Sequence, residues 1–222
     1  MSEFNVIEEN NDFIVVNKAS GLITEKSLYE RVTVETQVFN YLLKQKRKPY
    51  IGIIHRLDRV TSGVLVIAKK KSILVRFNTL FSSRKVQKTY LAIVKNQPTK
   101  HKGHLVNFLV KNTKEKRADI VKSKSKDALN CSLSYKVIDQ NDFGYLLEVK
   151  PKTGRFHQIR AQLAHIGLPI IGDEKYGSDE NYLPLSICLH AWKLTYEDSD
   201  SKTLKTFKAS LPNNDFWKFE TI

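Results

Sequence analysis

The residue whose type and spacing best suit chemistry is an aspartate with an arginine on each side. Asp58 lies between Arg56 and Arg59 in the segment HRLDRVTSG. An apolar run at Val64–Ala68 follows and predicts a buried strand. Nearby positive charge keeps a carboxylate ionised even where burial removes part of its water. Two interpretations stay open on these residues alone: an active carboxylate on a loop facing a cleft, or a structural ion pair that caps a turn.

HRLDRVTSG resembles the signature of the RluA-type family of RNA pseudouridine synthases, in which the aspartate starts the reaction. Three further segments resemble the family and follow in its order. They are KTYLAIV, which contains Tyr90, TGRFHQIR…GLPIIGDEKYG, which contains Arg160, and the Leu-His-Ala segment that begins at Leu189. The matches cover nearly the whole chain, so the resemblance implies a single pseudouridine synthase catalytic domain over residues 1–222. Because the first strand begins near residue 4, we expect no S4-type RNA-binding domain before it.

The resemblance implies an α+β fold with a mixed, mostly antiparallel central sheet, flanking helices and a basic catalytic cleft. The residue pattern predicts a helix capped by Thr33, a second capped by Ser72, and a third from the Lys152–Gly154 turn to Gly167. The segment Lys111–Lys126 is polar and basic, and predicts a mobile hairpin or loop that is either merely solvated or tracks phosphates. Strands are expected at Phe13–Val16, Val64–Ala68, Thr89–Val94, Leu129–Ile138, Gly144–Val149 and Thr206–Leu211.

Charge is the outstanding feature of the composition. The 37 Lys and Arg against 23 Asp and Glu give a net charge of +14, which favours a polyanionic partner. No apolar run approaches a membrane span, and the acidic N-terminus MSEFNVIEENND lacks a signal sequence. The two cysteines, Cys131 and Cys188, predict buried thiols in a reducing compartment. We therefore expect a cytoplasmic protein whose partner is structured RNA, acting as a monomer without an obligatory protein partner.

The resemblance also implies the roles of the site residues. Asp58 is the nucleophile or electrostatic catalyst, Arg160 pairs with it, and Tyr90 stacks on the target base. A tyrosine in a strand is, taken alone, more typical of core packing. Lys18, in the turn after the first strands, is expected to be structural, and Gln162 departs from a histidine usual in the family. Residues expected to bind substrate are His55 and Arg56 beside the site, Arg155 on phosphate, and Ile159 and Leu189 lining the pocket.

Pseudouridine formation breaks the N1–C1′ bond of uridine, turns the uracil and rejoins it through C5. It needs a carboxylate, a cation that orients it, an aromatic face and a base for the C5 proton. We expect no metal and no other cofactor, since no phosphate-binding glycine loop or metal-ligand cluster is present, and His101 and His104 are read as surface residues. Two alternatives remain: a non-catalytic RNA-binding protein on the same fold, and a glycosidase, which would need a second acid near Asp58.

Overall fold

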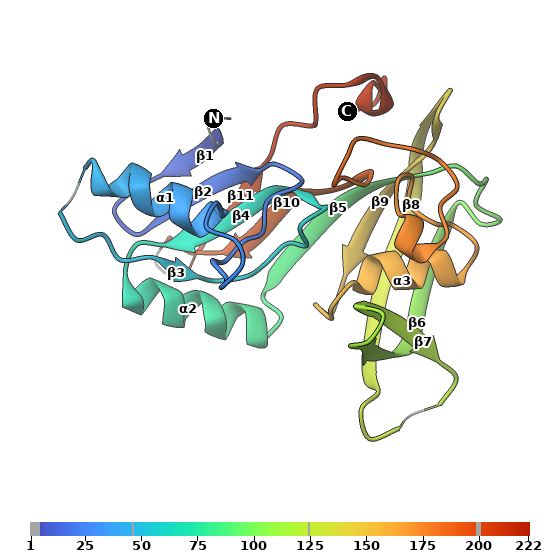
Figure 1. Ribbon diagram of the computed structural model, residues 1–222, viewed down its shortest axis with the longest axis horizontal. Helices are drawn as coiled ribbons and strands as arrows, with labels where there is room; N and C mark the ends of the chain where they lie inside the picture. Colours follow the sequence, from blue (N-terminus) through green and yellow to red (C-terminus); the bar gives the residue numbers. More distant parts are fainter. Residues whose placement is uncertain (1–4, 46, 124, 199–200) are drawn as a thin grey trace. The chain divides into compact units, whose positions relative to one another are not determined.

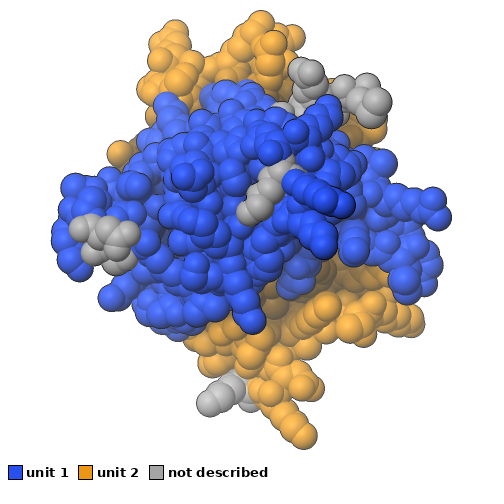
Figure 2. Space-filling view, turned by 90° about the vertical axis from the view of Figure 1, so that its left-hand side faces the viewer, with its two compact units in different colours: residues 1–88, 191–211 blue, residues 89–190, 212–222 orange. Residues whose placement is uncertain are grey.

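The computed structural model describes residues 5–45, 47–123, 125–198 and 201–222. Within it the chain forms two compact units, coloured separately in Figure 2. Unit 1 contains residues 1–88 and 191–211, and unit 2 contains residues 89–190 and 212–222. We expect a single catalytic domain from the sequence, and in the structure the chain passes repeatedly between two compact units.

Unit 1 is built on a sheet whose strands follow in the order β1, β2, β4 and β10 (Figure 1). The pairs β1–β2 and β2–β4 are antiparallel, β3 adds to β4, and β11 adds to β10. The strand β10 begins in unit 2 with its first two residues. The bounds are Asn5–Glu9 for β1, Phe13–Lys18 for β2, Gly52–Ile53 for β3, Ser62–Ala68 for β4, Leu189–Glu197 for β10 and Leu204–Lys208 for β11.

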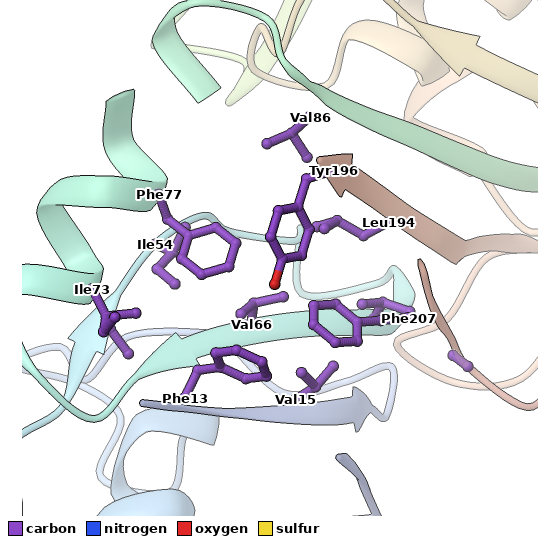
Figure 3. Packing of buried hydrophobic residues seen from close by; sticks show 13 residues of the cluster. Phe13, Val15, Ile54, Val66, Ile73, Phe77, Val86, Leu194, Tyr196 and Phe207 are labelled. Atoms are coloured by element: carbon purple, nitrogen blue, oxygen red, sulfur yellow. The ribbon is translucent and has the colours of Figure 1, made fainter. Parts of the chain in front are cut away.

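The core of unit 1 packs α2 (Lys71–Ser82) against these strands (Figure 3). Phe77 of α2 meets Phe13 and Tyr196 edge-on, with ring centroids 6.1 and 5.1 Å apart. All seven residues of β4 are buried, including those on its other face. A strand covered on both sides reads as a continuous apolar run, which is why Val64–Ala68 was predictable.

Two helix starts test the capping predictions. Thr33 caps α1 (Val34–Leu43) as predicted: its hydroxyl accepts from the Thr36 N–H at 3.2 Å, and the Thr36 hydroxyl accepts from the Thr33 N–H. The prediction of Ser72 as the cap of α2 is wrong. Lys70 takes the cap position with an extended backbone and no side-chain cap bond, so Ser72 already lies inside the helix.

Unit 2 is an antiparallel sheet in the order β5, β9, β8, β6 and β7, with α3 (Gln158–His165) beside it (Figure 1). The antiparallel strands and few helices agree with the expected α+β class. The strand bounds are Val86–Val94 for β5, Lys102–Asn112 for β6, Arg117–Val121 for β7, Leu129–Asn141 for β8 and Gly144–Pro151 for β9. The first three residues of β5 lie in unit 1. Two short 3-10 helices follow, η1 (Glu174–Tyr176) and η2 (Asp215–Trp217).

Several predicted boundaries differ from the structure. The basic segment 111–126 contributes the end of β6 and all of β7, so much of it is ordered hairpin. The third helix begins only at Gln158, because His157 takes a left-handed backbone with φ of 51°. Ile166, which directly follows this helix, is 37% exposed. The last strand ends at Lys208, and the basic residues Lys46 and Lys124 lie outside the described residues.

Among the described residues, no helix has the length and apolar character required to pass through a bilayer.

Candidate functional site

Asp58 lies on the loop between β3 and β4 of unit 1, and it is half-buried. Its carbonyl oxygen accepts from the Thr61 N–H at 3.1 Å, which closes a turn directly before β4. The next glycine, Gly63, brings the chain against the backbone of Ala191. The loop that carries the carboxylate is therefore fixed to a fully buried strand, as its place in the sequence predicted.

A buried lysine donates a hydrogen bond to the backbone of this loop. Lys18 is 1% exposed, and its Nζ donates to the carbonyl oxygens of Ala19, Leu22 and Arg59 at 2.9, 2.7 and 3.1 Å. Burial lowers the pKa of Lys18 to about 7, while the charge of Asp58 raises it and that of Arg59 lowers it. The structural role expected of Lys18 is confirmed. Its electrostatic interaction with Asp58 was missed, and the only signal for it was the lysine that opens the KASG turn.

The two arginines that flank Asp58 each contact an acid of their own. Arg56 pairs with Glu25 at 3.2 Å, and Arg59 pairs with Glu30. The spacing of these residues predicts that both arginines compensate the charge of Asp58. The structure shows that both guanidiniums also bind acids of the preceding loop, and that Lys18 is a further cation interacting with Asp58. The Arg56 side chain stays 73% exposed, and so remains accessible to a ligand.

His55 is engaged inside unit 1. Its Nε2 accepts from the backbone N–H of Val66 in β4 at 3.1 Å, and its ring stacks on Phe81 of α2. Burial, with the charge of Lys88, lowers the pKa of His55 to about 3, so the imidazole is neutral. This arrangement holds the loop to β4 and α2, and the expected RNA contact of His55 stays a prediction.

In unit 2, Arg160 lies in the first turn of α3 and forms a buried bidentate ion pair with Asp173. Its Nε and NH2 groups each donate to one carboxylate oxygen at 2.7 Å. The side chains are 5% and 1% exposed, and the guanidinium also lies 5.0 Å from the centre of the Tyr176 ring. A planar fork held in this way has a fixed direction. Asp173 was not among the predicted site residues, although the GDEKYG segment that contains it was noted.

His157 connects Arg160 to the rest of the unit. Its Nε2 lies 3.0 Å from an arginine NH group, and since arginine can only donate, Nε2 accepts. The ring proton is therefore on Nδ1, which donates to the Tyr176 hydroxyl at 3.1 Å. Burial, Arg160 and Lys175 lower the pKa of His157 to about 3, consistent with the neutral ring. The Tyr176 oxygen also accepts from the Ala118 N–H at 2.7 Å, which fixes β7 to this group.

The remaining predicted residues lie on β5, α3 and β10. Tyr90 is half-buried in β5, opposite Val149 of β9. Ile159 and Leu189 are 7% and 3% exposed, and Arg155 is exposed with its Nε donating to the Asn130 carbonyl at 3.3 Å. The structure thus brings Arg155, Ile159 and Arg160 together at the start of α3, in unit 2 with Tyr90 and Leu189. It brings His55, Arg56 and Asp58 together on one loop of unit 1.

The departure at Gln162 has a structural explanation. Gln162 is fully buried, and its amide donates to the Asn107 side chain at 2.7 Å and the Leu105 carbonyl at 3.3 Å. Its oxygen accepts from Gln158 at 3.0 Å. The glutamine therefore ties α3 to β6.

In the part of the chain that the structure describes, no cluster of three or more His, Cys, Asp or Glu side chains could hold a metal ion.

Comparison with known proteins identifies the family. The family described as RNA pseudouridylate synthase matches residues 12–165. A protein named "Uncharacterized RNA pseudouridine synthase" from Haemophilus influenzae is 31% identical, over 88% of this chain and 83% of its own. The tRNA pseudouridine synthase C of Vibrio parahaemolyticus is 30% identical, over 97% and 93%. The ribosomal large subunit pseudouridine synthase D of Borreliella burgdorferi is 32% identical over 93% of this chain, which spans only 65% of that relative.

Solved structures agree in fold. "Human RNA Pseudouridylate Synthase Domain Containing 4" aligns over 94% of this chain and 89% of its own, with a TM-score of 0.77 at 23% identity. "Human RNA Pseudouridylate Synthase Domain Containing 1" aligns over 95% and 83%, with a TM-score of 0.74. The fold and the sequence matches together show that this chain belongs to the RNA pseudouridylate synthase family, enzymes that isomerise uridine in RNA to pseudouridine.

Proposed function

We propose that this protein converts uridine to pseudouridine in structured RNA, either tRNA or a stem-loop of large-subunit rRNA, with Asp58 as the essential carboxylate. The observation that carries the proposal is the family match over residues 12–165, a range that contains Asp58, Tyr90 and Arg160. The names of the relatives, which include tRNA and ribosomal large subunit synthases, support this choice of substrate class.

The charge of the chain supports an RNA substrate. A net charge of +14 favours contact with a phosphate backbone, and the target base of a folded RNA must leave its stack before an enzyme can reach it. Arg56, whose side chain is 73% exposed beside Asp58, could fill the space that the base vacates. We place the reaction in the cytoplasm, in keeping with two free, buried cysteines, and expect the monomer to act without a protein partner.

In the proposed mechanism Asp58 attacks or electrostatically stabilises the reacting nucleoside while the N1–C1′ bond breaks. The uracil then turns and C5 bonds to C1′, while any bond formed to Asp58 breaks and returns its carboxylate. A base removes the C5 proton and N1 gains a proton, so the isomerisation is redox-neutral and cofactor-free. Lys18 keeps the Asp58 loop in place through its three carbonyl contacts. Preorganised charge of this kind lowers the barrier without reorganisation during the reaction.

We propose that Arg160 is the cation that the reaction requires, because the family resemblance assigns it this role. Its bidentate pair with Asp173 supports this role, since it would keep the cation from turning away during the reaction. Tyr90 would stack on the detached uracil and assist the late proton transfer, and Ile159 and Leu189 would line the pocket. Retention of the base matters because uracil lost to solvent ends the reaction.

The decisive experiment compares wild type with Asp58→Asn, using tritium release from [5-³H]uridine in tRNA and rRNA transcripts. We expect release by the wild type, none by Asp58→Asn, and equal RNA binding by both. Asp142→Asn, in the exposed turn between β8 and β9, is the matched control and should behave as wild type. Undiminished release by Asp58→Asn would refute its role. Binding without release by the wild type on every RNA would favour a non-catalytic RNA-binding protein.

A further inference from the structure

An aromatic side chain stands at the surface directly before α3. Phe156 is 39% exposed, and its ring stacks on the imidazole of His157, with the centroids 3.8 Å apart and the planes 20° from parallel. A single exposed apolar residue is ordinary on a protein surface. Phe156 is distinguished by the second ring beneath it, which supports one of its faces.

One cation lies over this ring, and another precedes it in the sequence. Lys111 of β6 holds its Nζ 5.2 Å from the centre of the Phe156 ring, and the neighbouring Arg155 is exposed. Phosphate contact by either cation requires no change in the backbone, because both side chains are long and lie at the surface. An exposed aromatic ring with a lysine over it and an exposed arginine next in the chain matches the chemistry of an unpaired nucleotide, which offers a base plane and a phosphate on each side.

The surroundings of the ring are rigid. His157, below Phe156, binds both Arg160 and the Tyr176 hydroxyl. That hydroxyl also accepts from the N–H of Ala118, and Ala118 is the register partner of Lys111 in the β6–β7 hairpin. The ring and the strand that carries Lys111 are therefore joined through one hydrogen-bonded group. Because these side chains are already held in place, a ligand loses little free energy in ordering them, and this favours binding.

We propose that Phe156 is a stacking platform for an unpaired base of the RNA substrate, with Lys111 and Arg155 binding the adjoining phosphates. The inference rests on the proposed function for the identity of the ligand. The base held here is a neighbour of the target uridine, which Tyr90 is proposed to stack. On binding, the base takes the place of the Lys111 ammonium over the ring, and the lysine moves to a phosphate. The neutral state of His157 helps, because a second cation under the ring would oppose Lys111 and Arg155.

The test separates stacking from charge. Wild type, Phe156→Leu, Phe156→Trp and Lys111→Gln are titrated onto unmodified tRNA transcripts by fluorescence anisotropy at several salt concentrations. Phe156→Leu should weaken binding about 5- to 100-fold with an unchanged salt slope, and Phe156→Trp should bind as wild type or more tightly. Lys111→Gln should reduce the slope of log affinity against log salt by about 0.7 to 0.9. The matched control is Phe39→Leu, whose ring on α1 is 40% exposed, and it should bind as wild type.

Tritium release by the same variants distinguishes failure of the stacking proposal from failure of the proposed function. For Phe156→Leu we expect a raised KM and an unchanged kcat, since a remote stacking contact contributes equally to the ground and transition states. Wild-type affinity of Phe156→Leu, with normal release by the wild type, would overturn the platform and leave the proposed function intact. So would a lowered kcat with unchanged KM, which would show that Phe156 acts through His157 and Arg160. If the wild type binds RNA but releases no tritium, the proposed function fails, while weaker binding by Phe156→Leu would still support the platform.

Discussion

The Nζ of Lys18 donates a hydrogen bond to the carbonyl oxygen of Arg59 at 3.1 Å, so a buried ammonium group is bound to the residue that follows Asp58. The same carbonyl accepts from the Gly21 N–H at 2.8 Å. The turn after β2 and the loop before β4 are thus joined at one oxygen. A cation at this point both fixes the backbone of the Asp58 loop and places positive charge near its carboxylate.

Lys18→Met should slow catalysis without weakening RNA binding. Methionine has a similar length but cannot donate to the three carbonyls, so the Asp58 loop loses its common support. A displacement of about 1 Å in a catalytic group costs on the order of 100-fold in rate. We expect kcat in single-turnover tritium release to fall by roughly 10- to 100-fold. Lys100→Met, in an exposed turn, is the control, and equal rates for the two variants would contradict the role.

Lys18 should also make the stability of the protein depend on pH. Its pKa is about 7 in the folded state against 10.5 for the ordinary side chain. Between these values the unfolded chain binds more protons than the folded one, so the free energy of unfolding rises with pH in this window. The Lys18→Met variant lacks this contribution.

Urea unfolding of both proteins at pH 7 and pH 9 measures the effect. The free energy of unfolding of wild type minus that of Lys18→Met should grow by about 2 kcal/mol between the two values. Subtraction removes the contributions of other groups that titrate in this range. A difference that does not change with pH would show that burial leaves the ammonium of Lys18 without a lowered pKa.

The parts of this fold that sequence predicts are those set by local pattern. The Thr33 cap of α1 follows from a hydroxyl before an apolar helical repeat, and β4 follows from an unbroken apolar run. The loop of Asp58 was located because a polar turn precedes that strand. Local rules failed at the start of α3, since histidine is enriched in left-handed backbone but adopts it too rarely for a prediction at His157.

The partners of the charged groups were not predictable in the same way. Arg160 binds Asp173, and Lys18 interacts with Asp58, across stretches of chain whose proximity only the tertiary fold creates. Nearness in sequence pointed to Arg56 and Arg59 beside Asp58, but it did not reveal that these arginines also pair with Glu25 and Glu30. The family resemblance identified the candidate site residues, and the structure showed which groups bind them.

Asp173→Asn should destabilise the protein and lower its activity together. The substitution keeps the shape of the side chain but removes the charge that compensates a guanidinium only 5% exposed. Breaking a buried pair in this way costs about 3–5 kcal/mol. The matched control is Asp215→Asn, whose pair with Lys218 is 73–76% exposed and should contribute little. Urea unfolding and tritium release measure the two effects. Equal stability of the two variants would mean that Arg160 does not depend on Asp173.

Gly63→Ala should disrupt the strand that supports Asp58, because two constraints act on this glycine. Its φ is +116°, and an added Cβ would lie 2.2 Å from the carbonyl oxygen of Ala191 and 2.6 Å from its nitrogen. Both atoms belong to backbone, so no side chain can move aside. Gly63 is also the register partner of Lys18, so any displacement reaches the ammonium that holds the Asp58 loop.

Gly167→Ala tests backbone strain in the absence of a steric clash. Gly167 has a φ of +77°, but an added Cβ there would meet nothing within 4 Å. Left-handed backbone alone costs a non-glycine residue about 1–2 kcal/mol, so Gly167→Ala should lower the melting temperature by a few degrees. Gly63→Ala should lower it much further and abolish tritium release, since backbone overlap adds to the strain. Similar melting temperatures for the two variants would show that β4 can move away from Ala191, and that the Asp58 loop is less firmly fixed than its contacts indicate.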